Sequence, residues 1–287
     1  AGLEILKKGG NAVDAAIAVA AVLTVVEPVS NGLGGDAFAI VWMKDKMVGL
    51  NASGYSPKEI SIDKLKAGGY NKMPKHGWLP VTVPGQPKAW AALSKRFGRL
   101  SLEDVLAPAI RYAEEGYPVS AVVSVLWDKY VRQDSKLFKD NPIFDEWFKT
   151  FTKNGEPYQF GEIVKFKNHA KTLRLIAQSN ADAFYKGEIA DQIDAQSKRD
   201  GGFIRKEDLA EYDVEWVDPI HVSYRGYDVW EIPPNGQGIV ALMALNILKN
   251  FEFTSRDDTD TVHKQFEAMK MAFSDAYATV TDSKDMK

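Results

Sequence analysis

The sequence of 287 residues contains no cysteine. This absence excludes disulfide bonds, thiolate metal ligands and a cysteine nucleophile, and it leaves the redox compartment open. An excess of charge of one sign is also lacking, because 36 Lys and Arg residues stand against 39 Asp and Glu residues and the formal net charge is −3. No overall basic field attracts phosphate backbones, so we expect no nucleic-acid partner.

A hydrophobic run long enough to cross a bilayer is absent as well. The nearly apolar stretch at residues 12–26 is shorter than the roughly 20 residues of a transmembrane helix, so we expect no membrane span in this chain. Glu4 and Asp14 interrupt the pattern of a signal peptide, so we expect no export signal, and the compartment stays unknown with a leaning to the cytoplasm. Asn11 as N-cap and Asp14 in the first turn predict a buried, alanine-rich helix instead.

The remaining pattern predicts a mixed α/β chain. Strands are predicted at residues 37–42, 46–52, 212–217 and 219–232, with turns at Lys44-Asp45 and Arg225-Gly226. Helices are predicted at residues 12–26, 89–97, 102–115, 238–250 and 261–278, with Ser101 as one cap, Asp258 or Asp260 as another, and Gly116 as a stop. Helices dominate between them as far as residue 195, and we expect the turns of residues 118–151, with Trp127 and Trp147, to pack around one another. Without a repeat or a long linker, residues 1–287 are predicted to form a single domain portion.

Neither of two glycine-rich segments has the features of a phosphate loop. Residues 32–35 lie between a predicted helix and a predicted strand, whereas a phosphate loop needs the strand first and the helix second. Residues 233–238, PPNGQG, have the right order but lack the Lys-Ser/Thr pair of a P-loop and the acidic ribose partner of a dinucleotide site. We therefore expect no cofactor at either segment.

The titratable residues form no evident metal or acid/base site. The four histidines are His76, His169, His221 and His263, and no two of them have metal-ligand spacing. Adjacent carboxylates, Glu114-Glu115 and Asp257-Asp258, point to different sides of a helix and are expected at the solvated surface. The basic stretch at residues 165–174 is only a weak indication of nucleic-acid binding. The favoured interpretation is the solvent-exposed face of a helix that buries Leu173 and Ile176 on its other face.

Four segments together resemble the large subunit of the γ-glutamyltransferase family. Residues 1–41 resemble its start through GGNAVDAA and VVEP. In the same order follow VPG at residues 83–85 with the helix-Gly-helix through Gly116, PPNGQGIVALMALNIL at residues 233–248, and HKQFEAMKMAFSDA at residues 263–276. The resemblance covers essentially the whole chain, and the motifs are specific in combination.

This resemblance implies an α/β (α+β) fold, the four-layer αββα sandwich of N-terminal-nucleophile hydrolases, of which this chain would be the large-subunit portion. Such proteins are made as one zymogen that cuts itself autocatalytically into a heterodimer of a large and a small subunit. The nucleophile is a threonine at the new N-terminus of the small subunit, where its free α-amine can act as the base. We therefore expect no catalytic residue in this chain, a small subunit and a small-molecule amide as partners, and no metal or organic cofactor.

The sequence departs from the family where the substrate would bind. In the transferases an arginine after the second strand binds the α-carboxylate of the γ-glutamyl group, and a glutamate is the next residue after that arginine. Here Ser53 stands at the arginine position and Gly54 at the glutamate position, after Asn51. The charge-assisted hydrogen bond between an arginine and a carboxylate contributes about 1.5–3 kcal/mol. A serine hydroxyl carries no positive charge and cannot replace this contact. Asn51, Ser53 and Gly54 are the predicted substrate-binding residues.

The departure leaves several interpretations open. Another cation could bind the carboxylate, the substrate could lack it, as glutaryl amides of cephalosporin acylases do, or Ser53 could be a turn residue that contacts nothing. Asp36 within the glycine run and Ala276 in place of a usual arginine are further differences. The expected function is an amide hydrolase or acyltransferase. The alternatives are a non-catalytic binding homologue and a true glutathione-cleaving γ-glutamyltransferase with altered carboxylate recognition.

Overall fold

The computed structural model describes residues 1–286, and these form two compact units. The first, here called the helical unit, comprises Ala1–Asp36 and Gly54–Asp213. The second, called the strand unit, comprises Ala37–Ser53 and the residues from Val214 onward. The predicted single domain portion stays a prediction. Within residues 1–286, no helix combines the length and the apolar character that crossing a bilayer requires.

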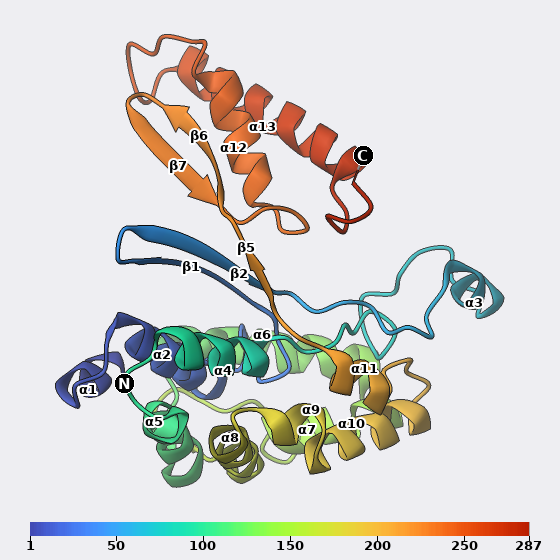
Figure 1. The fold of residues 1–287 in the computed structure, drawn as a ribbon. Helices are drawn as coiled ribbons and strands as arrows, with labels where there is room; N and C mark the ends of the chain where they lie inside the picture. Colours follow the sequence, from blue (N-terminus) through green and yellow to red (C-terminus); the bar gives the residue numbers. More distant parts are fainter. Residues whose placement is uncertain (287) are drawn as a thin grey trace. The chain divides into compact units, whose positions relative to one another are not determined.

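The helical unit consists of helices with one short pair of strands (Figure 1). Its helices are α1 (Gly2–Lys7), α2 (Ala12–Val26), α3 (Ile62–Ala67), α4 (Gln86–Phe97), α5 (Leu102–Glu115), α6 (Ala121–Phe138), η1 (Pro142–Phe144), α7 (Asp145–Phe151), α8 (Lys167–Ser179), α9 (Asp182–Tyr185), α10 (Glu188–Arg199) and α11 (Lys206–Glu211). The strands β3 (Tyr117–Pro118) and β4 (Ile163–Val164) pair antiparallel inside the stretch that was expected to be helical. Two residues are too few for a detectable period, which is why the pattern missed them.

Helix α2 begins with the cap that the sequence predicts. The Asn11 side chain accepts the N–H groups of Val13 and Asp14, while the Asp14 carboxylate accepts the Asn11 N–H at 2.9 Å. Asp14 is fully buried and also accepts the Arg99 N–H at 3.0 Å. Since this carboxylate satisfies backbone donors from two segments, it fixes the start of α2 against the chain that follows α4.

Helices α5 and α8 pack against each other and bury the aliphatic residues between them. Ser101 caps α5, and Gly116 ends it with a φ of +99°, as predicted. Leu173 and Ile176 of α8 are fully buried, while Arg174 points outward and pairs with Glu114. The interpretation of residues 165–174 as part of a helix with one solvent-exposed face is therefore confirmed.

The strand unit contains two sheets and two helices (Figure 1). Its elements are β1 (Ala37–Met43), β2 (Lys46–Ala52), β5 (Glu215–Val217), β6 (Ile220–Tyr224), β7 (Tyr227–Glu231), α12 (Gly238–Leu248) and α13 (Thr259–Thr279). The strands β1, β2 and β5 form an antiparallel sheet in that order, and β6 and β7 form a hairpin. Helices α12 and α13 pack through small residues, Val240, Ala244, Ala272 and Ala276.

Most predicted boundaries of the strand unit are confirmed. Lys44 and Asp45 adopt φ of 51° and 58° in the β1–β2 turn, the conformation that a two-residue hairpin loop needs. Asp258 is the cap of α13 and accepts the Thr261 N–H at 2.7 Å. The predicted strand at 212–217 is wrong at its start, because only residues 215–217 pair with β2. Likewise α12 ends at Leu248, two residues earlier than expected.

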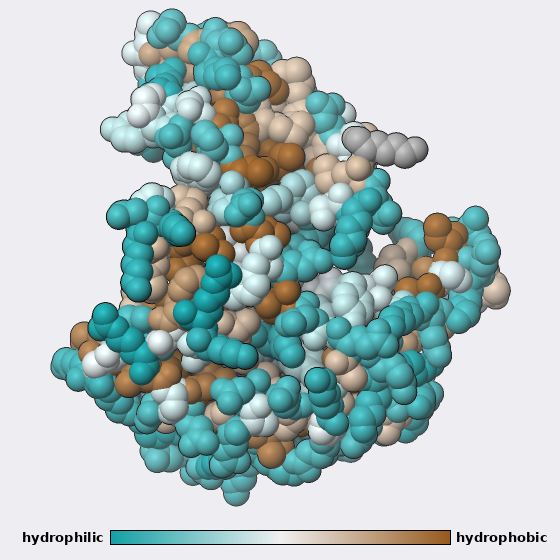
Figure 2. Space-filling model, viewed as in Figure 1, coloured by the Kyte–Doolittle hydropathy of each residue, from teal (hydrophilic) through white to brown (hydrophobic). Residues whose placement is uncertain are grey.

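Along strand β1, half-buried and exposed side chains alternate. Phe38, Ile40 and Trp42 point to one side and are 44%, 40% and 64% exposed. We call these three residues the open face of β1. On the neighbouring strand Leu50 and Ala52 are fully buried. Figure 2 shows apolar residues, coloured brown, at the surface over the β1–β2 ribbon and near α12.

Candidate functional site

The end of β2 carries a small network of neutral polar side chains. Asn51 Nδ2 donates to Asn235 Oδ1 at 2.8 Å, and Asn51 Oδ1 accepts the Ser53 N–H at 3.0 Å. Asn235 Nδ2 donates to Ser53 Oγ at 3.0 Å. We call Asn51, Ser53 and Asn235 the amide network. It joins the end of β2 to the loop between β7 and α12, two segments that are 184 residues apart at Asn51 and Asn235.

Each member of the amide network has a clear structural origin. Asn51 lies on β2, where its backbone pairs with β1 and β5, and only 8% of the residue is exposed. Ser53 follows the strand and is half-buried, so its hydroxyl reaches solvent as well as Asn235. A hydroxyl and two carboxamides supply donors and acceptors but no formal charge. The network can therefore orient a polar group by hydrogen bonds, and it cannot form an ion pair with a carboxylate.

Gly54 has a conformational role that a side chain would prevent. Its φ is +78°, and a Cβ atom placed on it would lie 1.9 Å from the carbonyl oxygen of Val83. The Val83 N–H donates to the next carbonyl, that of Tyr55, at 2.9 Å, which fixes the close approach of the two backbones. A glutamate, which the family resemblance places here, does not fit this backbone. The prediction that Gly54 also contacts substrate stays a prediction.

The structure brings together two of the three predicted binding residues and adds one that the sequence analysis missed. Asn51 and Ser53 share the amide network, whereas Gly54 does not take part in it. The interpretation of Ser53 as a turn residue without contacts is wrong, because both its N–H and its hydroxyl are hydrogen-bonded. Asn235 belongs to the PPNGQG segment, which contributes to the family resemblance and lacks the features of a phosphate loop, but for which no binding residue was predicted. Nothing in the sequence alone links that segment to β2.

Asn235 also lines a small cavity of about 190 Å³ in the strand unit. The other lining residues come from the loop before α12, from α12 and from the region of α13, and they are Gln237, Ile239, Val240, Phe273, Ala276, Tyr277 and Val280. The cavity is thus apolar along the two helices and polar at Asn235 and Gln237. A cavity of this size suits a small group and not a drug-sized ligand.

Ring contacts define the surroundings of His169 and His221. Among residues 1–286, no three His, Asp or Glu side chains gather as metal ligands do. His169 is packed against Phe166, and burial lowers the pKa of its imidazole. His221 stacks on Trp230, with its Nδ1 3.6 Å from an Asp228 carboxylate oxygen. These positions are explained by packing.

The fold is that of enzymes which transfer or hydrolyse acyl groups. The structure called cephalosporin acylase from Bacillus halodurans superposes on the whole chain with a TM-score of 0.97 and 54% sequence identity, and the chain covers 53% of it. The gamma-glutamyltranspeptidase of Helicobacter pylori also superposes on the whole chain, with a TM-score of 0.90 and 31% identity, and 82% of that chain is covered. The predicted α/β (α+β) fold of the N-terminal-nucleophile hydrolases is confirmed.

The family model for gamma-glutamyltranspeptidase matches residues 1–287, and the chain belongs to this family. The glutathione hydrolase-like YwrD proenzyme of Bacillus subtilis is 39% identical over 98% of this chain and 53% of its own length. The glutathione hydrolase proenzyme of Escherichia coli is 34% identical over 96% of this chain and 47% of its own. The acylase ACY 1 proenzyme of a Pseudomonas strain (SE83) is 32% identical over 98% of this chain and 52% of its own. The chain thus spans about half the length of the curated relatives it matches.

Proposed function

We propose that this chain is the large-subunit portion of an amide hydrolase or acyltransferase, and that a small subunit from the same precursor supplies the threonine nucleophile. The threonine Oγ attacks the acyl carbonyl, and the free α-amine of that threonine takes the hydroxyl proton and delivers it to the leaving amine. The acyl group then passes from the threonine ester to water or to another amine. The names of the relatives, which are proenzymes about twice as long as this chain, support the proposal.

The open face of β1 supports a partner for this chain. Phe38, Ile40 and Trp42 expose apolar side chains on β1, and β1 is an edge of the sheet that the described residues form. An exposed apolar edge strand is an aggregation hazard unless another element covers it. We assign this face to the small subunit, which would pack on the apolar side chains and pair with the free strand edge.

The amide network carries the proposal about the acyl group. Because Ser53 stands where the transferases have arginine and its partners are both carboxamides, the network offers hydrogen bonds and no positive charge. We propose that the network lines the acyl pocket and no longer selects for the α-carboxylate of a γ-glutamyl group. A glutaryl or related acyl amide is the favoured substrate class, in line with the likeness to the Bacillus halodurans protein that is named a cephalosporin acylase.

Kinetics on Ser53→Arg test the acyl preference. We expect this change to raise the ratio of γ-glutamyl to glutaryl amide turnover, measured as kcat/KM, by about tenfold or more, since a guanidinium–carboxylate contact contributes about 1.5–3 kcal/mol. Ser53→Ala, which loses the hydroxyl without adding charge, and Ser56→Arg, at an exposed position three residues further on, are the matched controls. An unchanged ratio in Ser53→Arg, with normal folding, refutes the proposal.

The relatives named glutathione hydrolase favour a second candidate, a glutathione-cleaving transferase with altered carboxylate recognition. Glutathione assayed beside the glutaryl amide separates the two, because a glutathione hydrolase prefers glutathione before any substitution. A denaturing gel of the full-length product distinguishes the two candidate enzymes from a non-catalytic binding homologue. Two bands from one precursor are expected of the enzyme, and an uncut precursor after long incubation favours the homologue.

A further inference from the structure

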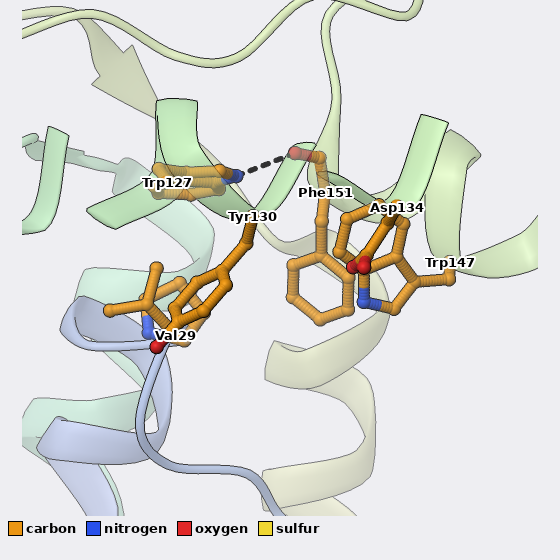
Figure 3. Close-up of a pocket in the computed structure, with 7 residues that line it drawn as sticks. Val29, Trp127, Tyr130, Asp134, Trp147 and Phe151 are labelled. Carbon is orange, nitrogen blue, oxygen red and sulfur yellow. Dashed lines mark hydrogen bonds between the residues drawn. The ribbon is translucent and has the colours of Figure 1, made fainter. Parts of the chain in front are cut away.

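A second cavity lies within the helical unit, among residues that have no part in the amide network. Its volume is about 220 Å³, and it lies between helices α6 and α7 and the loop after α2 (Figure 3). Its walls carry four aromatic side chains, one carboxylate and two loop residues, namely Trp127, Tyr130, Trp147, Phe151, Asp134, Pro28 and Val29. The combination of rings with a single acid distinguishes it from an ordinary packing defect, which is lined by aliphatic groups.

Helical spacing explains why these side chains converge. Trp127, Tyr130 and Asp134 are three and four residues apart on α6, so they share one face of that helix. Trp147 and Phe151 are four residues apart on α7 and share a face in the same way. Trp127 and Trp147, whose turns were expected to pack around one another, both line this cavity, and their ring contacts are with other residues.

Hydrogen bonding and packing hold the cavity wall in place. Trp127 Nε1 donates to the carbonyl oxygen of Phe151 at 2.7 Å, which ties α6 to the end of α7 (Figure 3). The Trp127 ring is 2% exposed and packs against Tyr158 and Phe166, while the ring of Trp147 packs against Phe151. The rings are therefore positioned before any ligand arrives, which lowers the entropic cost of binding.

Asp134 is a carboxylate that forms no ion pair among the described residues, although His76 acts on it electrostatically. Among the described residues it takes part in no hydrogen bond and in no ion pair, and burial raises the pKa of its carboxyl group, an effect that His76 opposes. A carboxylate that has lost part of its hydration is stabilised by a positive charge close to it. The faces of aromatic rings likewise attract cations. Both parts of the wall thus favour the same kind of occupant.

We propose that this cavity binds a small organic cation with a methylated ammonium group, such as a quaternary ammonium compound. A metal ion needs several oxygen ligands at once, whereas this wall places a single carboxylate beside four aromatic side chains. Methyl groups on nitrogen spread the charge over a surface that the rings of Trp127, Trp147 and Phe151 contact, and Asp134 balances it. The ammonium of Lys129, which does not line the cavity, already lies 5.9 Å from the centre of the Tyr130 ring.

Calorimetric titration of the full-length protein with tetramethylammonium and with choline tests the proposal. We expect saturable binding of both, and at least about tenfold weaker binding of 3,3-dimethylbutanol, which has the shape of choline without its charge. Sodium chloride at equal ionic strength controls for general salt effects. Absence of saturable binding, or equal affinity for the neutral analogue, overturns the proposal. No acyl substrate is used, so the outcome is independent of the proposed function.

Two variants locate the binding. Asp134→Asn keeps the side-chain volume and removes the charge, and we expect it to weaken choline binding about tenfold or more. Asp140→Asn, at an exposed position beyond the end of α6, is the matched control and should bind as the parent does. Tyr130→Leu, which changes the most accessible ring, provides a second test should Asp134→Asn fold poorly. Unchanged affinity in Asp134→Asn or in Tyr130→Leu contradicts the assignment.

Discussion

The helical unit and the strand unit differ in the size of the apolar side chains that they bury. In the helical unit, large side chains such as Leu106, Trp127 and Tyr185 are at most 2% exposed. In the strand unit, α12 and α13 meet through alanines and a valine, while Trp42 and Tyr277 are 64% and 80% exposed. Apolar burial contributes about 25 cal/mol per Å², so the helical unit has the larger internal source of stability. The strand unit instead leaves more of its large apolar side chains on β1 and α13 exposed.

The two units also satisfy their buried polar groups differently. Asp14 in the helical unit accepts the backbone N–H groups of Asn11 and Arg99. Asn51 in the strand unit donates to the side chain of Asn235 and accepts the Ser53 N–H, and the Asn235 side chain in turn donates to the Ser53 hydroxyl. Backbone partners rigidify a position, whereas a network of half-exposed side chains can rearrange around a ligand. This difference is in line with the proposal that the amide network lines the acyl pocket.

The largest expected effect comes from Gly54→Ala in the helical unit. The new Cβ would meet the Val83 carbonyl oxygen and the φ of +78° disfavours alanine, so we expect the free energy of unfolding to fall by about 4 kcal/mol. Gly201→Ala is the matched control, since its φ is +77° with no atom within 4 Å of the new Cβ. It should cost about 1–2 kcal/mol. Urea denaturation measures the unfolding free energy of both variants. Equal losses of stability would show that the backbone at Val83 moves to make room for the new Cβ.

A smaller effect is expected from removing each unit's buried polar anchor. Asp14→Ala leaves the N–H groups of Asn11 and Arg99 without their acceptor and should lower the unfolding free energy by about 3 kcal/mol. Asn51→Ala should cost only about 1 kcal/mol, because water reaches the groups it leaves at half-buried Ser53. The shifts of the denaturation midpoints give both losses of stability, provided that the dependence of the unfolding free energy on denaturant concentration is unchanged. Equal costs would contradict the contrast between the two units.

Two buried tyrosines of the helical unit should respond oppositely to loss of the hydroxyl. Tyr185 donates to the Pro84 carbonyl at 2.6 Å and accepts the Lys88 N–H at 3.1 Å, so Tyr185→Phe should cost about 1–2 kcal/mol. The Tyr117 hydroxyl is buried and, among the described residues, has no partner. Tyr117→Phe should therefore be neutral or stabilising. A clear destabilisation in Tyr117→Phe would reveal a partner for that hydroxyl.

The same tyrosines predict a loss of stability at alkaline pH. Burial raises the pKa of both hydroxyls above the ordinary value of 10. Above pH 10 the unfolded chain releases these protons and the folded chain keeps them, so the unfolding free energy falls as pH rises, and below pH 10 it is unaffected. The slope is about 1.4 kcal/mol per pH unit for each group. Tyr117→Phe should reduce the slope, and an unchanged slope would exclude Tyr117 as a source.

The smallest effect on folding is expected from Trp42→Ser on the open face of β1. Because Trp42 is already 64% exposed, the unfolding free energy of this chain should change by no more than about 0.5 kcal/mol. Its association with the proposed small subunit should nevertheless weaken, seen as loss of co-elution after size-exclusion chromatography. Tyr227→Ser, at a residue of β7 that is 76% exposed, is the control. Undisturbed association in Trp42→Ser would remove the open face from the proposed interface.

Local signals account for the parts of the fold that were predicted. The caps at Asn11, Ser101 and Asp258 and the turn at Lys44-Asp45 depend on hydrogen bonds or backbone angles within a few residues, so the sequence displays them directly. The short pair of β3 and β4 was missed because its pairing joins segments far apart and each strand has two residues. Asn235 was missed for the same reason, since its partner Asn51 is 184 residues away.

The sequence by itself determined most helices, the hairpins and the family, and it predicted that Ser53 stands at the arginine position of the transferases, because these depend on residue type and short-range spacing. The tertiary structure alone decided that Ser53 and Asn51 meet Asn235, that Gly54 lies against Val83, and that rings from α6 and α7 surround one carboxylate. Such contacts join segments distant in the chain. They arise only when the apolar faces of many elements pack together, and no local pattern specifies which residues then become neighbours.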